Sequence, residues 1–203
     1  LMFMNFLNRF KGIVIFFIME KTIIGLISYK VLNYVLEKYT TKKLAMNYTA
    51  MSHAKTASII WLFGTPTMMI MNSGGYFLFD ILYLFKNRKI NLMNLLYYYH
   101  HIACLYYMSL SPLKYNWFNV LGVGELSNIP TYFVYHYLKT DPGGEKLKRW
   151  KIVQKIWYGG NRIIVASILT YNEINHPERF WKLLPVLPLY TFGLLWAGFM
   201  FKQ

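Results

Sequence analysis

The chain has 203 residues, of which 56% are hydrophobic, 19% aromatic and only 15% charged. Soluble domains usually carry about 25% charged residues, so this composition, with its apolar residues in long runs, excludes an ordinary soluble domain. The formal net charge is +14, but the Lys and Arg residues lie in short segments between the apolar runs. That distribution favours contact with anionic lipid headgroups over nucleic-acid binding. The single cysteine, Cys104, excludes an internal disulfide.

Seven apolar runs predict helices, each bounded by polar residues, Gly or Pro. In chain order they are Ile13–Leu36, Thr56–Met71, Gly74–Phe85, Leu92–Leu110, Trp117–Leu138, Val153–Tyr171 and Leu183–Phe201. About 20 residues are needed to cross a bilayer, so the third run is expected to extend at both ends. Pro66 and Pro130 are expected inside helices, where each frees a backbone carbonyl. The predicted fold is an all-α, multipass transmembrane bundle of six or seven helices around a central cavity.

The first run is interrupted by Glu20 and Lys21. It is expected either to cross the membrane with these two side chains paired or to lie partly in the interface. We therefore divide the chain into an N-terminal membrane-associated helix, residues 1–42, and a helical membrane domain, residues 43–203.

Basic residues gather in three connections, at Glu37–Lys55, Lys86–Asn91 and Lys139–Lys151. The intervening connections are neutral or of mixed charge. Because cytoplasmic loops carry an excess of Lys and Arg, the three basic connections and the C-terminus are expected in the cytoplasm. Arg9 and Lys11 contradict a fully inserted first helix, which would place them outside. Either the first run is not a true crossing, or the strongly basic downstream loops override these two residues.

Several ionisable residues fall inside the apolar runs, where they are costly unless they are paired or functional. They are Asp80, the adjacent pair His100 and His101, Glu125 and Arg162. At about 1.5 Å of rise per residue, His100, Glu125 and Arg162 each lie about 12 Å from a helix end, so a shared internal cavity is expected. His53 precedes its run and is expected nearer the cytoplasmic surface. The alternative role of the charged residues is a structural ion-pair network that fixes helix register.

A neutral imidazole in an apolar cavity suits general-base work or nucleophilic attack on an activated acyl group, with a nearby carboxylate to orient it. Adjacent histidines on a helix point about 100° apart and cannot chelate one metal together. His100 and Cys104 have a suitable spacing, but no second ligand pair accompanies them, so no metal site is predicted. If one histidine is active, it should face a cavity with Asp80, Glu125 or Arg162, while the other packs in a helix interface.

Five blocks carry a resemblance to a known family. In order they are SHAKTASIIWLF (Ser52–Phe63), SGGYFLFDILYLF (Ser73–Phe85), YYYHHIACLYY (Tyr97–Tyr107), GELSNIPTYFVYHYL (Gly124–Leu138) and WYGGNRIIVA (Trp157–Ala166). Together they resemble the TLC domain of translocating-chain-associated membrane proteins, ceramide synthases and the ceroid-lipofuscinosis protein 8 group. The resemblance covers about residues 43–203. It implies a lipid protein of the endoplasmic reticulum or a related internal membrane, and in the synthases the matching histidine pair is tied to acyl transfer from acyl-CoA.

The acidic block departs from the synthases, which carry paired aspartates where this chain has Glu125, Ser127 and Asn128. The chain thus looks closer to the small, generic TLC-domain proteins. The expected function is lipid homeostasis, either as an acyltransferase with acyl-CoA as donor substrate and no other cofactor, or as a non-enzymatic lipid-binding or cargo-receptor protein. The candidate catalytic residues are His100, His101 and Glu125. The candidate substrate-binding or structural polar residues are His53, Asp80, Asn161 and Arg162. Membrane lipids are the expected partners.

Overall fold

The computed structural model describes residues 2–87, 92–110, 116–175, 180–181 and 183–202, and every regular element in these ranges is a helix. The all-α class predicted from the sequence is therefore confirmed. The elements are α1 (Met2–Tyr39), α2 (Lys42–Phe63), α3 (Pro66–Met69), the π-helical turn η1 (Ile70–Gly74), α4 (Gly75–Asn87), α5 (Leu92–Ser109), α6 (Trp117–Thr140), α7 (Glu145–Gly159), the π-helical turn η2 (Gly160–Val165), α8 (Ala166–Ile174) and α10 (Leu187–Lys202).

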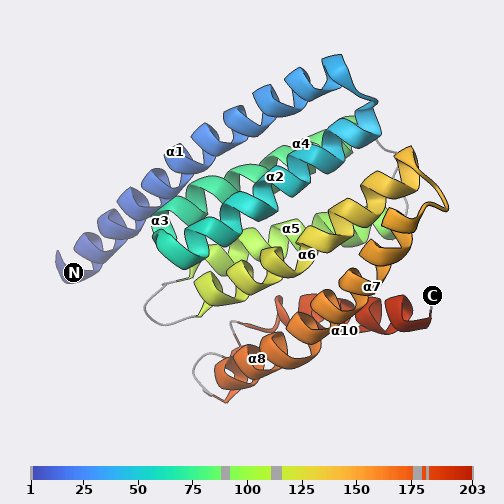
Figure 1. Ribbon diagram of the computed structural model, residues 1–203. Coiled ribbons are helices and arrows are strands. Elements are labelled where there is room, and N and C mark those ends of the chain that lie inside the picture. The colour runs from blue at the N-terminus through green and yellow to red at the C-terminus, as the bar shows by residue number, and fades with distance from the viewer. Residues whose placement is uncertain (1, 88–91, 111–115, 176–179, 182, 203) are drawn as a thin grey trace.

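The helices lie side by side as an elongated bundle (Figure 1). On one side of the bundle α1 packs on α4 and η1, while α2 packs on α6 in its middle. On the other side α6 contacts α7, and α10 contacts α7 and η2. The two chain ends lie at opposite ends of the bundle, blue and red in Figure 1.

The second predicted helix and its neighbouring loop were placed wrongly. Helix α2 begins at Lys42, where the Thr41 hydroxyl accepts from the Leu44 backbone N–H, and ends before Gly64. The predicted loop at Glu37–Lys55 is thus reduced to residues 40–41. Pro66 does not lie inside a helix but begins α3 after the Thr65 cap, as proline does at a first helical position.

The first and sixth predicted helices begin too late, since α1 begins at Met2 rather than Ile13 and α7 at Glu145 rather than Val153. Several other boundaries agree with the predicted runs. Helix α6 contains Pro130 as expected, and the third run extends at both ends because α3, η1 and α4 form one continuous helix, Pro66–Asn87. The third basic connection, at Lys139–Lys151, is reduced to residues 141–144 between α6 and α7. Of the second, at Lys86–Asn91, residues 88–91 lie outside the described part of the chain, as do 111–115 and most of 176–182.

Two π-helical turns interrupt the long helices, and each adjoins a Gly-Gly pair, Gly74-Gly75 or Gly159-Gly160. A π-helical turn places one extra residue in the turn, which breaks the register between the side chains before and after it. Both turns carry polar residues, Asn72 and Ser73 in η1 and Asn161 and Arg162 in η2. In η1 both polar side chains are buried, whereas in η2 Asn161 bonds the backbone of its own helix and Arg162 reaches α6.

Judged by length and composition, one helix among the described residues qualifies to cross a membrane. It is Pro66–Asn87, with 22 residues and a mean hydropathy of 1.3. The helix Leu187–Phe201 is apolar but shorter. Since 56% of the apolar window of Pro66–Asn87 is buried against other helices, this helix alone would also fit the core of a soluble protein. The six or seven crossings stay a prediction.

Helix α1 crosses the long helix Pro66–Asn87 closely at two glycines. A Cβ atom added at Gly75 would lie 2.5 Å from the backbone of Gly25, and one added at Gly25 would lie 1.9 Å from the carbonyl oxygen of Met71. The two backbones meet there, so only glycine fits.

We expect Gly75→Ala to lower the melting temperature, since overpacking at a rigid backbone contact costs about 1–3 kcal/mol. Gly198→Ala in α10 is the matched control, because a Cβ there meets nothing within 4 Å and alanine favours the helix by about 0.5–1 kcal/mol. The only cysteine, Cys104, is buried, so its reactivity with a fluorogenic maleimide during heating reports unfolding in detergent. Equal melting temperatures for both variants would contradict the close crossing.

Candidate functional site

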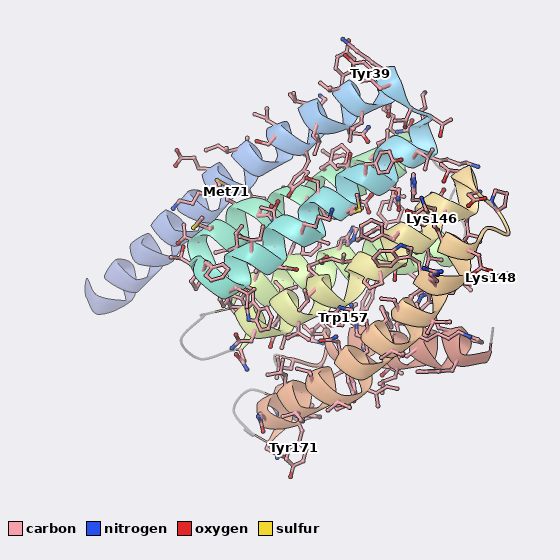
Figure 2. The ribbon with its side chains drawn as sticks, viewed as in Figure 1. Tyr39, Met71, Lys146, Lys148, Trp157 and Tyr171 are labelled. Atoms are coloured by element: carbon pink, nitrogen blue, oxygen red, sulfur yellow. The ribbon has the colours of Figure 1, made fainter. Side chains whose placement is uncertain are left out.

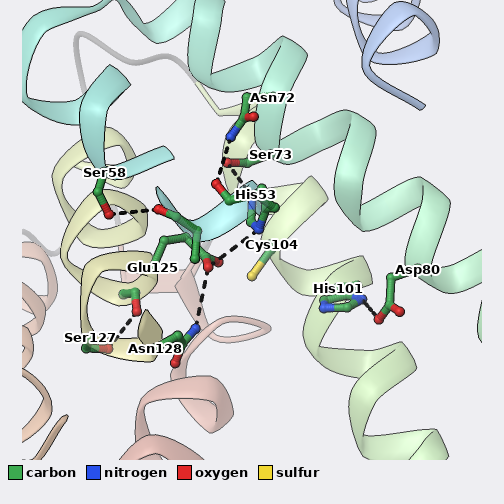
Figure 3. Close-up of polar contacts among 12 residues, drawn as sticks. His53, Ser58, Asn72, Ser73, Asp80, His101, Cys104, Glu125, Ser127 and Asn128 are labelled. Carbon is green, nitrogen blue, oxygen red and sulfur yellow. Dashed lines mark hydrogen bonds and ion pairs between the residues drawn. The ribbon is translucent and has the colours of Figure 1, made fainter. Parts of the chain in front are cut away.

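The centre of the bundle holds a buried carboxylate opposite a buried imidazole. Glu125 of α6 is 6% exposed, and its Oε2 lies 3.6 Å from Nδ1 of His53, which is 0% exposed (Figure 3). His53 was expected near the start of its helix and the surface. Because α2 begins at Lys42, it instead lies in the middle of α2, fully buried. Removing either partner would take a charge or hydrogen-bonding group away from the other in the core.

The turn η1 holds the imidazole from its other side. Ser73 Oγ lies 3.0 Å from His53 Nε2, and the Asn72 side chain donates to the backbone carbonyl of His53 at 3.4 Å. The Tyr29 hydroxyl of α1 donates to the Asn72 side-chain carbonyl. The ring of Tyr76 stacks on the imidazole with 4.1 Å between centroids. The Ser73 hydroxyl donates to the sulfur of Met69 at 3.2 Å, so its oxygen is left to accept from His53 Nε2. The ring proton then sits on Nε2, and Nδ1 faces the Glu125 carboxyl without a hydrogen-bond partner among the described residues.

Asn128 connects Glu125 to Arg162. One turn beyond Glu125, its Nδ2 donates to Glu125 Oε2 at 3.5 Å, and its Oδ1 accepts from Arg162 Nη2 at 3.4 Å. The same guanidinium nitrogen donates to the Gly124 carbonyl at 3.3 Å. The acid and the arginine thus share an amide rather than forming a direct ion pair. The turn η2 brings Arg162 to this face of α6.

His101 and Asp80 form a separate pair between α5 and α4. His101 Nδ1 lies 3.1 Å from Asp80 Oδ2, and both side chains are less than a tenth exposed. The imidazole also stacks on Phe77, with 5.0 Å between ring centroids. In Figure 3 this pair lies apart from the Glu125 cluster. It ties two neighbouring helices together inside the core.

His100 faces a cavity that His101 does not reach. The cavity has a volume of about 90 Å³ and lies between α5, α6, α8 and residues 183–190. Most of its wall is apolar, from Leu, Val and Tyr side chains. Its polar wall includes His100, Glu125, Arg162 and Thr170. A volume of this size holds several water molecules, or the head and first carbons of a larger ligand.

Of the residues predicted to be catalytic, His100 and Glu125 therefore line one cavity and His101 lies outside it. Among the other candidates, Arg162 lines the cavity. His53 is not part of the cavity wall but contacts Glu125, and Asp80 pairs with His101. Asn161 does not join them, because its amide donates to the Trp157 carbonyl at 2.8 Å. His100 Nε2 lies 3.8 Å from Cys104 Sγ, one turn along α5. Within the described residues, no group of three or more His, Cys, Asp and Glu is placed to hold a metal ion.

Asn128, Ser73, Asn72 and Tyr29 were not selected as candidates from the sequence. Asn128 could have been found, because it follows Glu125 by three residues and shares its helix face. The other three carry no local signal, since their partners lie in other helices.

Comparisons with protein-family models, curated proteins and solved structures found no match to this chain. The resemblance to the TLC domain therefore stays a prediction from the sequence.

We expect Asn128→Ala to destabilise the bundle by about 1–3 kcal/mol, because it leaves a buried carboxylate and a guanidinium without their shared partner. Asn161→Ala is the matched control, because Asn161 bonds only a backbone carbonyl of its own helix, and such changes stay within about 0.5 kcal/mol. Thermal unfolding followed by Cys104 reactivity compares the two variants. A melting temperature for Asn128→Ala equal to that of the wild type would remove Asn128 from the network.

Proposed function

We propose that this chain is an integral membrane protein of lipid homeostasis, of the endoplasmic reticulum or a related internal membrane, whose cavity binds part of a lipid. One observation carries the proposal: many large apolar side chains are exposed, although the core is already apolar and also holds ionisable residues. Buried positions hold ionisable residues such as His53, Asp80 and Glu125, while large apolar side chains face outward along the helices. Exposed apolar side chains in this number are typical of a membrane or partner contact.

The exposed apolar side chains follow several helices rather than a single patch. Examples are Ile27 and Val31 on α1, Phe63 on α2, Ile164 on η2 and Phe199 on α10. Water would make all of these surfaces unfavourable, whereas lipid tails solvate them. Helices whose backbone groups are satisfied internally are suited to that solvent.

One end of the bundle carries lysines, which supports the expected orientation. Figure 2 shows Tyr39, Lys146 and Lys148 at this end and Met71 and Tyr171 toward the other. The connections at residues 40–41 and 141–144 lie at the same end as the C-terminus. This end is proposed to face the cytoplasm.

We expect single cysteines introduced as Lys146→Cys and Tyr171→Cys, each on a Cys104→Ala background, to be labelled from opposite sides of the membrane. An impermeant maleimide added to sealed microsomes should reach position 146 directly and position 171 only after permeabilisation. Both wild-type side chains are exposed, so their accessibility depends on topology. The parent chain with Cys104 alone is the control and should label only after denaturation. Labelling of both positions from one side would contradict the membrane-spanning bundle.

Acyl transfer is the second candidate function, favoured by His100 and Glu125 in the wall of one cavity. In such a reaction the nitrogen of a lipid amine or the oxygen of a lipid hydroxyl attacks the thioester carbonyl of acyl-CoA, while His100 takes its proton. The new amide or ester forms and the carbon–sulfur bond breaks. The coenzyme A thiolate leaves and receives the proton from His100. The non-enzymatic alternative uses the same cavity for lipid binding alone.

We expect His100→Ala to abolish the change in lipid composition that expression of the wild-type chain causes, if the chain transfers acyl groups. His136→Ala is the matched control, because His136 contacts the Tyr48 hydroxyl, is absent from the cavity wall and should leave the change intact. Lipidomics of cells with equal amounts of each protein compares them. Equal lipid shifts from wild type and His100→Ala would contradict catalysis and favour the non-enzymatic binding protein.

A further inference from the structure

Arg162 presents hydrogen-bond donors for which the described residues supply no acceptor. A guanidinium carries five N–H donors in a fixed fork. The acceptors that contact it are the Gly124 carbonyl and the Asn128 side chain, both on Nη2 at 3.3 and 3.4 Å. Its Nε is buried without a hydrogen-bond partner among the described residues. A buried unpaired donor on a cation is costly, so these residues leave the guanidinium incompletely satisfied.

Arg162 also has no direct counter-ion. Among the described side chains, the ion pairs within 4.0 Å are His53 with Glu125, His101 with Asp80 and Lys148 with Glu145. Glu125, the nearest acid by connectivity, directs its Oε2 to His53 and Asn128. The positive charge therefore stands at the cavity wall without a carboxylate of its own.

Arg162 lines the cavity, and its Cζ lies 5.2 Å from the centroid of the Tyr158 ring. Gly124 of α6 and Gly193 of α10 lie beside the guanidinium, and Cβ atoms added there would come within 3.7 and 3.5 Å of the Arg162 side chain. The rest of the wall is apolar, with Leu183, Val186 and Leu187 among its members. A cation at one point of an otherwise apolar cavity matches an amphiphile with a charged head and a hydrocarbon chain.

We propose that Arg162 binds the carboxylate of a single-chain fatty acid, whose first carbons lie against the apolar wall. The planar fork of Arg matches a carboxylate through two parallel N–H···O bonds. This inference rests on the proposed lipid-binding function and names the ligand class of the same cavity.

The experiment measures binding of oleate, methyl oleate and oleoyl lysophosphatidic acid to the purified full chain in nanodiscs of phosphatidylcholine. Oleate and methyl oleate share the hydrocarbon chain and differ in charge. Wild type should bind oleate more tightly than methyl oleate. Arg162→Gln should weaken oleate binding about tenfold, as loss of a charge-assisted bond predicts, and leave methyl oleate unchanged. Arg149→Gln, an exposed arginine on α7, is the matched control and should not change either affinity.

Oleate-selective thermal stabilisation of the wild type gives a second measurement that needs no variant. Equal affinity of the wild type for oleate and its methyl ester overturns the inference and leaves lipid binding standing. Tighter binding of the lysophosphatidic acid overturns the carboxylate assignment. Loss of both oleate and methyl oleate binding in Arg162→Gln assigns Arg162 a structural role and overturns the inference. Failure of all three lipids to bind the wild type overturns the proposed function as well.

Discussion

The carboxylate of Glu125 is buried inside a bundle whose outer faces are apolar, and its need for partners constrains the rest of the structure. Taking an acid out of water is costly unless hydrogen bonds and opposite charge replace the lost hydration. Those partners come from three places: His53 from α2, Asn128 from the next turn of α6, and Arg162 through that amide from η2. Because each contact has a narrow range of distance, α2, α6 and η2 can be combined in few registers.

The two π-helical turns place side chains where they reach the residues around Glu125. A regular helix over residues 66–87 or 145–174 would distribute its side chains at a fixed pitch. With η1 and η2 inserted, Ser73 reaches the His53 ring and Arg162 reaches α6. Each turn adjoins a Gly-Gly pair, where the backbone is least restricted. Gly75 serves a second purpose, since its missing side chain lets α1 approach closely enough for Tyr29 to bond Asn72.

Helical geometry also separates the two adjacent histidines. Neighbouring residues on an α-helix point about 100° apart, so one imidazole enters the cavity while the other faces α4. His101 is committed to Asp80 and Phe77, and its contacts hold two helices together. Among the described residues, Cys104 is the one side chain that forms a hydrogen bond with His100. The imidazole of His100 is therefore available to a ligand. The site is thus one histidine, one acid and one arginine around an apolar space, with the second histidine as support.

The all-α class and most helix positions follow from the sequence, because long apolar runs act locally. The runs at Leu92–Leu110 and Trp117–Leu138 match α5 and α6 to within two residues at each end. The start of α2 did not follow, since Lys42, Lys43, Asn47 and His53 give that segment the composition of a loop. In the bundle Asn47 donates to the Tyr132 carbonyl and His53 faces Glu125, so partners on α6 make this polar stretch a helix. Sequence alone could mark Glu125, His100 and Arg162 as costly in an apolar setting. Which of them share a space was decided by contacts between distant helices, because hydrogen bonds and ion pairs depend on distances that only packing sets.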